Sequence, residues 1–281
     1  SIAMMQSSEQ TLISTPDVER IIALSTLATV YAYGLRIAGH GFYVLTLTDL
    51  DITLVFDVTS KLWLTWSSLT VGTPVTLTSL TRSGTTITCT KSAHGLVDGA
   101  TVTISGCDQN DYNGVTAVSY VDANTFTYEA DSLQATTGTG TIQYTPYTES
   151  YFKFTRFVQC SGRNFVLHET NGHLYEILAS AEDDAGAPIE VRTRSTKVDG
   201  GNLQSKRLAR LAVVGSRVDD LILVRWSDDD YTTNSSYRRL SLAQDDLSLR
   251  RGGSFLRRAF ETKYVGAAAI ELAEMDLEFK E

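Results

Sequence analysis

The sequence predicts an all-β protein: propeller-like antiparallel blades, interrupted by an inserted small β-barrel and followed by a β-sandwich-like segment. Three observations predict it. β-Branched and aromatic residues alternate with period two, turn-forming Gly, Asn and Asp recur at short intervals, and only four prolines interrupt the 281 residues. Proline lacks a backbone donor and breaks strand pairing, so three of the four prolines are taken as domain boundaries. The predicted domains are residues 1–74, one or more blades; 75–146, the inserted module; 147–187, a further blade; and 188–281, the C-terminal antiparallel segment.

The first predicted blade is an antiparallel meander between Pro16 and Pro74. In FYVLTLT, residues 42–48, period-two alternation puts largely apolar side chains on both faces, as in a strand that is covered on both sides. LVFDVTSKLWLTW, residues 54–66, follows as a strand, a five-residue turn and a strand that carries Trp63 and Trp66.

The inserted module has more Thr, Ser and Gly and only two basic residues, Arg82 and Lys91. Short strands separated by turn residues are typical of a small barrel or sandwich. The predicted strands lie near residues 75–81, 85–90, 100–105, 115–121, 125–129 and 139–145.

After Pro146 the sequence predicts a second meander, with a turn at residues 161–164 and a strong hairpin signal at Asn171-Gly172. Two such meanders separated by an insertion indicate radial repetition. The remaining chain is enough for only two or three blades. We therefore expect that further N-terminal blades or other subunits complete the packing.

The segment after Pro188 mixes charged and apolar residues with period two. Ile189, Val191 and Thr193 share one predicted face, and Glu190, Arg192 and Arg194 share the other. This pattern predicts an antiparallel β-sandwich with a solvated charged face.

The net charge of −9 is unevenly distributed. Residues 1–187 hold 8 basic and 18 acidic residues, a net of −10, whereas residues 188–281 hold 16 and 15, a net of +1. A chain this acidic is repelled by nucleic acid on average, so DNA contact would be confined to a small face. The candidate DNA- or subunit-contact residues are three arginine pairs: Arg238, Arg239, Arg250, Arg251, Arg257 and Arg258.

Two interpretations of these arginines remain open. Adjacent strand residues point to opposite faces, so each pair would place one guanidinium on each side and pair across strands with Asp245, Asp246 or Glu261. The alternative is a ring of positive charge, built when copies assemble, that touches passing DNA phosphates.

Neither catalytic residues nor a cofactor or metal site is predicted. The three cysteines are far apart, His168 and His173 lack a metal-ligand spacing, and no phosphate-binding glycine loop or nucleophile motif occurs. RWSDDDYTT, residues 225–233, approximates an Asp-box, which is a structural turn, so its three aspartates are predicted to form a turn. Without about 18 consecutive apolar residues, no membrane span is predicted.

Two resemblances add to this interpretation. The run from CTKSAHGLVDG to DANTFTY, residues 89–128, resembles a small β module of bacteriophage structural proteins. This resemblance implies either a stiff spacer that buries His94 and Tyr112 for structural reasons or a module that binds the host surface or decorates the particle.

The other blocks resemble the packaged-DNA stabilisation or tail nozzle proteins of short-tailed bacteriophages. AGHGFYVLTLTDLDITLVFDVTSKLWLTWSS, residues 38–68, is similar to that family's G-H-x-F-Y-V-L-T pattern with its following tryptophan strand, and NFVLHETNGHLYEIL resembles its next strand pair. LILVRWSDDDYTT resembles the family's W-S-D-D-G-G turn, with Asp230 and Tyr231 in place of the two glycines, and FLRRAF resembles its arginine-rich ending.

The resemblance implies a structural virion protein, not an enzyme. It implies a nozzle or plug ring, a hexamer in this family, that retains packaged double-stranded DNA, forms its exit channel and contacts other tail and portal-adaptor proteins. Such a protein is made in the host cytoplasm and resides in the virion tail. The alternatives are a tail adhesin that uses the module at 75–146 to bind a receptor, a generic scaffold without a channel role, and a sialidase-like glycan hydrolase.

Overall fold

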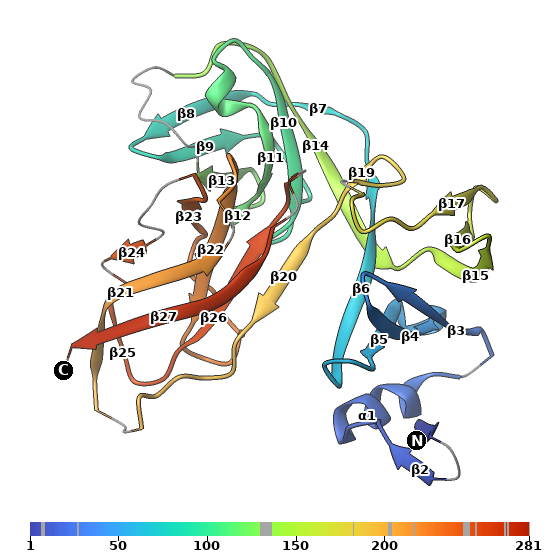
Figure 1. Ribbon diagram of the computed structural model, residues 1–281. Coiled ribbons are helices and arrows are strands. Elements are labelled where there is room, and N and C mark those ends of the chain that lie inside the picture. The colour runs from blue at the N-terminus through green and yellow to red at the C-terminus, as the bar shows by residue number, and fades with distance from the viewer. Residues whose placement is uncertain are drawn as a thin grey trace. The chain divides into compact units, whose positions relative to one another are not determined.

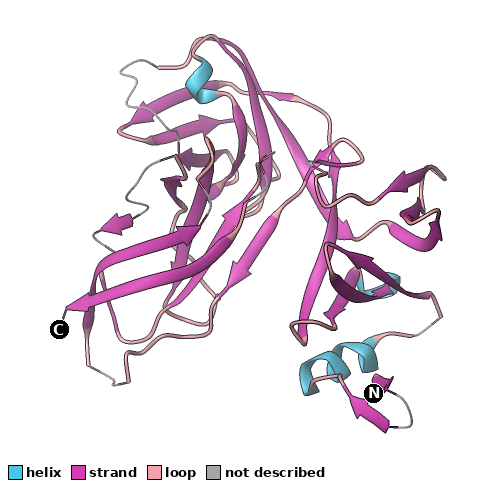
Figure 2. Ribbon diagram, in the orientation of Figure 1, coloured by secondary structure: helices cyan, strands magenta, loops and turns pink. Residues whose placement is uncertain are grey.

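The computed structural model describes every residue except 7–8, 27, 130–136, 182, 202–203, 216, 244–247, 251, 267, 269 and 281. Antiparallel strands dominate the described residues (Figure 2), so the predicted all-β class is confirmed. None of the sheets that the described strands form is closed. The chain divides into two compact units: unit 1 consists of Ser1–Thr70 and Glu149–Ala187, and unit 2 of Val71–Thr148 and Pro188–Glu281. Unit 2 thus combines the residues of the predicted inserted module with the C-terminal segment.

Unit 1 begins with a hairpin and a helix that was not among the predicted elements. The hairpin is β1 (Ala3–Gln6) with β2 (Glu9–Leu12), and the helix is α1 (Pro16–Leu24). Thr15 caps the helix because its Oγ1 accepts a hydrogen bond from the Val18 amide at 3.4 Å, and proline fits the first turn, where its missing donor is not needed.

Four strands form the central meander of unit 1, in the order β3-β4-β5-β6 (Figure 1). Apolar side chains pack on both faces: Leu45 and Leu54 on one, Val44 and Val55 on the other. The predicted two-sided burial is therefore confirmed, and Trp63 and Trp66 pack on opposite faces of β6. The elements are β3 (Val30–Ile37), β4 (His40–Leu47), the 3-10 turn η1 (Thr48–Leu50), β5 (Ile52–Asp57) and β6 (Leu62–Val71).

The second predicted meander is confirmed in the remaining part of unit 1. Its first turn is shorter than predicted: Cys160 pairs directly with Arg163, because Ser161 and Gly162 both take positive φ, at 51° and 77°, as a two-residue hairpin turn requires. The elements are β15 (Phe154–Cys160), β16 (Arg163–His168), β17 (Leu174–Glu176) and the short pair β18 (Asp183–Asp184) and β19 (Ala187–Pro188).

The first half of unit 2, residues 71–148, packs two antiparallel sheets on one core. The sheets have the orders β12-β13-β9-β8 and β11-β10-β14, and Phe126 and Ile87 of the first meet Ile104 and Tyr144 of the second. The elements are β7 (Val75–Thr76), β8 (Ser79–Ser83), β9 (Thr86–Thr90), β10 (Thr101–Cys107), η2 (Asn110–Tyr112), β11 (Gly114–Ala117), β12 (Ser119–Asp122), β13 (Thr125–Glu129) and β14 (Gly140–Tyr151).

The predicted burial of His94 and Tyr112 in this half is confirmed. His94 Nε2 donates to the Asp122 carbonyl at 2.7 Å, while its Nδ1 accepts from the Leu96 amide at 3.0 Å. The ring therefore bonds to the backbone on both sides and fixes the loop before β10.

The second half of unit 2 also consists of two antiparallel sheets around a shared core, which includes Leu211, Val224 and Phe260. One sheet has the order β20-β26-β22-β23, and in the other β21 pairs with β24, β25 and β27. The elements are β20 (Val191–Arg194), β21 (Lys206–Gly215), β22 (Leu221–Ser227), β23 (Arg238–Ser241), β24 (Ser248–Arg250), β25 (Ser254–Phe255), β26 (Ala259–Tyr264) and β27 (Leu272–Lys280).

Replacement of Phe126 by alanine tests the core of the first half. Because this ring is fully buried between the two sheets, we expect the Phe126→Ala variant to lose about 3–5 kcal/mol of unfolding free energy in urea. The control is Val121→Ala on β12, where the side chain is 54% exposed and the expected change is within about 0.5 kcal/mol. Equal losses in the two variants would contradict the assigned core.

Candidate functional site

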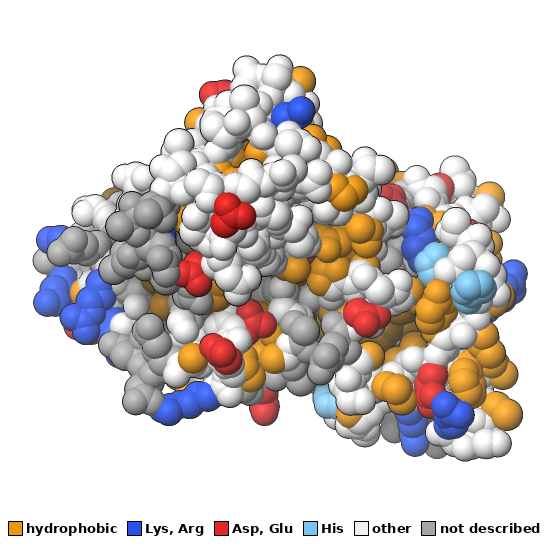
Figure 3. Space-filling view, turned by 90° about the horizontal axis from the view of Figure 1, so that it is seen from above, with side chains coloured by type: hydrophobic (Ala, Val, Ile, Leu, Met, Phe, Trp, Pro, Cys, Tyr) orange, Lys and Arg blue, Asp and Glu red, His pale blue; other side chains and the backbone are white. Residues whose placement is uncertain are grey.

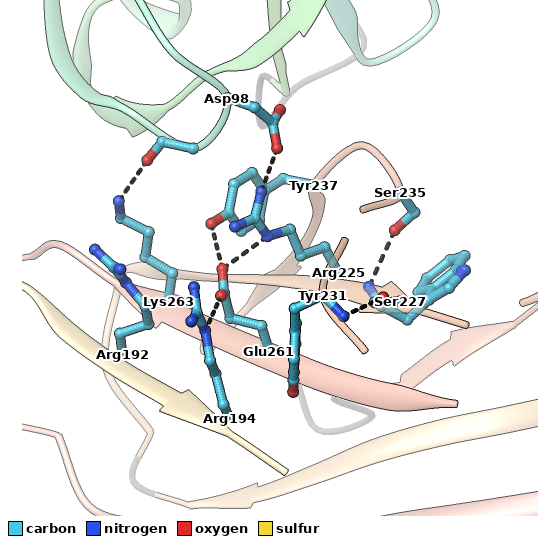
Figure 4. Close-up of polar contacts among 12 residues, drawn as sticks. Asp98, Arg192, Arg194, Arg225, Ser227, Tyr231, Ser235, Tyr237, Glu261 and Lys263 are labelled. Carbon is cyan, nitrogen blue, oxygen red and sulfur yellow. Dashed lines mark hydrogen bonds and ion pairs between the residues drawn. The ribbon is translucent and has the colours of Figure 1, made fainter. Parts of the chain in front are cut away.

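A cluster of charged side chains lies between the two halves of unit 2 (Figure 4). Arg225 on β22 is buried, and its Nε donates to Glu261 Oε1 on β26 at 2.7 Å. Tyr237 donates to the same oxygen at 2.6 Å, and Arg194 Nε on β20 donates to Glu261 Oε2 at 2.6 Å. The Arg225 guanidinium also lies 4.5 Å from the centre of the Tyr237 ring. Glu261 thus binds two arginines and one phenol.

A second ion pair lies beside the first. Lys263 follows Glu261 by two residues on β26 and therefore shares its face. Its Nζ lies 2.9 Å from Glu190 Oε2 and donates to the Gly99 carbonyl at 2.8 Å. Glu190 also accepts hydrogen bonds from Thr101 Oγ1 at 2.7 Å and from Arg192 Nε at 3.1 Å.

Residues of the first half cover this charged face. Asp98 accepts from Arg225 Nη1 at 2.6 Å, and Ser119 Oγ accepts from the Tyr237 amide at 3.2 Å. Ala117 packs with Leu223 and Tyr237 in a small apolar cluster beside the ions. The prediction of a solvated charged face therefore holds only in part. Arg192 and Arg194 are exposed on β20, as predicted. The charged side chains of the neighbouring strands β22 and β26 instead pack against residues 71–148, where pairing neutralises them.

The burial and pairing of these groups shift their pKa values. Burial opposes the ionisation of Glu261, but hydrogen bonds from Tyr237, Arg225 and Arg194 outweigh it and lower its pKa. Burial likewise opposes ionisation of Glu190, and the charges of Lys263 and Arg192 lower its pKa instead. Burial raises the pKa of the Tyr237 phenol, which stays a hydrogen-bond donor. The cluster is therefore a set of fixed charges at neutral pH.

Gly99 allows the close approach of the two halves. Its φ is +83°, and a Cβ atom there would lie 3.3 Å from both terminal nitrogens of Arg225. An L-residue is strained in this conformation and would also crowd the guanidinium. The turn at Asp98-Gly99 thus presents a carboxylate and a carbonyl to the charged face, and the absence of a side chain on Gly99 lets the guanidinium approach.

Of the six candidate contact arginines, Arg238 and Arg239 lie on β23, and Arg250 lies exposed on β24. Arg238 bridges two strands, since its Nη1 donates to the Arg250 carbonyl at 3.0 Å. Arg257 is exposed in the bend after β25, whereas Arg251 lies outside the described residues, as do the proposed partners Asp245 and Asp246. In the face drawn in Figure 3, Lys and Arg side chains gather at the left, the side of unit 2 where β24 lies in Figure 1.

Arg258 is enclosed within unit 2. Its Nε donates to Asp228 Oδ1 at 2.7 Å and its Nη2 to Asp228 Oδ2 at 2.8 Å, a bidentate ion pair. Its guanidinium lies 4.4 Å from the centre of the Phe255 ring. The charge of Arg258 therefore stabilises the loop after β22. Glu261, which the sequence suggested as a partner of the arginine pairs, instead binds Arg194 and Arg225.

The aspartates of RWSDDDYTT form a turn, as predicted. Asp229 Oδ1 accepts hydrogen bonds from Ser227 Oγ and the Thr233 amide, both at 2.8 Å, so it closes the loop on itself. Asp230 forms an ion pair with Lys197. Asp230 and Tyr231 take positive φ, at 62° and 63°.

The sequence did not predict the buried cluster, because the pattern that accompanies it is ambiguous. In AFETKY, residues 259–264, Glu261 and Lys263 occupy one face of a strand and Phe260, Thr262 and Tyr264 the other. All six residues are buried, so charge in this strand marks a covered polar layer. From the sequence alone, this pattern cannot be distinguished from that of a strand with one solvent-exposed face.

Among the residues that the structure describes, no group of three or more His, Cys, Asp or Glu side chains could hold a metal ion. In the same part of the chain, no helix has the length and apolar character needed to cross a membrane. The three cysteines are unpaired.

Comparison with known proteins adds no relative. No protein-family model matches the sequence, and no curated protein matches it.

Replacement of Glu261 by glutamine tests the cluster. The Glu261→Gln variant leaves Arg225 and Arg194 facing a neutral group in a buried layer, so we expect a loss of about 3–5 kcal/mol of unfolding free energy. Hydrogen exchange of peptides from β22 and β26 should accelerate most. Glu9→Gln, at an exposed position on β2, is the matched control. Unchanged protection of β22 would show that the cluster is dispensable.

Acidification provides a second test. Because Glu190 and Glu261 have lowered pKa values in the folded protein, the stability they contribute is complete above the unfolded pKa of about 4.3 and is lost as the pH falls through their folded values. We expect the urea midpoint, followed by circular dichroism, to fall more steeply below about pH 4 in the wild type than in the Glu261→Gln variant. Parallel pH profiles would contradict the assigned shift of Glu261.

Proposed function

We propose that this chain is a structural virion protein of a phage tail. In this proposal copies of the chain form a nozzle or plug ring that retains packaged double-stranded DNA and provides its exit channel. The ring, a hexamer by family resemblance, contacts other tail and portal-adaptor proteins and works through its shape, without enzymatic turnover.

The conformation of the loop after β22 is the observation that best supports this proposal. The tail nozzle family pattern W-S-D-D-G-G has glycines where this chain has Asp230 and Tyr231. Both residues take positive φ, a conformation that favours glycine and is uncommon for other residues. Tyr231 is held there by hydrogen bonds from its hydroxyl to the Phe260 carbonyl at 2.9 Å and the Ser195 carbonyl at 3.1 Å. Both positions thus have a conformation that glycine adopts readily, which supports the resemblance although the residues differ.

The most specific block of the resemblance, residues 38–68, also supports it. This block forms β4, β5 and most of β6, and its tryptophans pack in the two apolar clusters of unit 1. The residues of this block that match the family pattern therefore include side chains that pack in the core. This agrees with a resemblance that reflects a shared fold.

The distribution of charge fits a channel that does not hold DNA tightly. The chain is acidic overall, and three of its C-terminal cations, Arg225, Arg258 and Lys263, are buried in ion pairs. Fewer cations are then free to bind phosphates, so neutral or acidic surfaces would line the lumen and DNA could slide past them.

The proposal includes a finer architecture. Unit 1 would be a propeller-like pair of blades whose packing is completed by further blades or by other subunits. Among the described residues, most members of its two apolar clusters are only partly buried, which supports such a need. The barrel that we expect for residues 75–146 belongs to the same proposal.

Sizing and imaging of the purified chain test this function. We expect light scattering to give a multiple of 30.8 kDa and electron microscopy to show rings with a central hole. Binding of duplex DNA should be lost at about 0.15 M salt, because few phosphate contacts are made. A monomer at all concentrations, or tight duplex binding at this salt concentration, would refute the proposal.

A further inference from the structure

One long strand edge in unit 2 has no partner among the described residues. β27 contains nine residues and pairs with β21 along one side, and no other described strand pairs with its outer side. Met275, Leu277 and Phe279 point toward the core. An exposed strand edge of this length presents unpaired backbone donors and acceptors, so it can pair with another chain.

Most of the outward-facing charged side chains of this edge are acidic, with Lys280 at its end as the exception. Glu274, Asp276 and Glu278 alternate with the core residues and are all exposed. None of them forms an ion pair with another described residue. Like charges repel, so two β27 edges disfavour pairing with each other, and a partner must bring positive charge.

Among the described residues, the opposite edge of the same sheet carries two exposed arginines, Arg250 on β24 and Arg257 in the bend after β25. Arg210 on β21 pairs with Arg250 of β24 on one side and with Glu278 of β27 on the other, so these two strands lie on opposite sides of β21 at one level. β25 lies on the side of β24, because Arg207 pairs with both Ser254 and Lys280. The exposed Arg257 lies two residues after the end of β25.

An exposed aliphatic side chain also lies near the charges of each edge, one on β21 beside β27 and the other in the bend after β25. Val214, which is 45% exposed, pairs with Glu274, and Leu256, which is 55% exposed, precedes Arg257. A stable protein contact needs apolar area as well as complementary charge. Exposed apolar area and charge therefore lie together near both edges.

We propose that the β27 edge of one copy docks against the β24–β25 edge of the next copy. The occupant is a second copy because the acidic edge and its basic complement lie on opposite sides of one sheet of one chain. Such a contact is heterologous, so each copy uses both edges, and repetition with a fixed rotation closes into a ring. This inference rests on the proposed ring function and identifies the surface that would build the ring.

Charge reversal at each edge tests the contact. The acidic-edge variant is Asp276→Lys with Glu278→Lys, and the basic-edge variant is Arg250→Glu with Arg257→Glu. We expect each variant alone to need on the order of tenfold or more higher concentration for half-assembly, measured by light scattering, because reversal places like charges opposite each other. The control is Glu9→Lys with Asp219→Lys, two exposed acids that belong to none of the strands β24, β25 and β27, which should assemble like the wild type.

Mixing gives the decisive result. An equimolar mixture of the acidic-edge and basic-edge variants should recover assembly, because both new interfaces then join opposite charges. Wild-type assembly that is insensitive to both reversals, or a mixture that stays apart, would overturn the docking contact while leaving the ring function standing. A wild-type chain that never assembles would overturn both. If the wild type assembles only after a basic partner protein is added, the docking contact between copies is also overturned.

Discussion

The ion pair between Arg225 and Glu261 joins residues that lie far apart in the sequence. Asp98, Arg194 and Tyr237 converge on these two side chains, so the cluster fixes how the two halves of unit 2 meet. Removing charges from water is costly, and a buried ion pair adds little stability compared with apolar packing. Its effect is specificity: any other register between the halves would leave an arginine or a carboxylate buried without a partner.

Much of the local structure could be predicted because local chemistry determines it. The alternation in FYVLTLT, the Asn171-Gly172 turn and the aspartates after β22 each act over a few residues, and the structure agrees with these predictions. The N-terminal helix was not predicted, although Thr15 and Pro16 provide a start signal for it.

The candidate site could not be predicted because it depends on a contact between distant segments. Period two correctly placed Glu190 and Arg194 on one face, but it does not distinguish a wet face from a covered one. The partners Asp98 and Gly99 lie in another part of the sequence, and only the fold brings them to Arg225 and Lys263. The exposed arginines and the free edge of β27 also become related only through strand order.

Each unit consists of two segments that are separated in the sequence, and this determines when each unit can finish folding during synthesis. Unit 1 needs residues 149–187 to finish its core, and these emerge only after the whole first half of unit 2. That half can bury its own apolar core, yet Asp98 and Gly99 stay in water until β22 and β26 have been made. A chain that ends before β22 therefore has no buried charge without a partner. The Asp98 carboxylate and the Gly99 carbonyl, which later bind Arg225 and Lys263, are then hydrated on a surface turn.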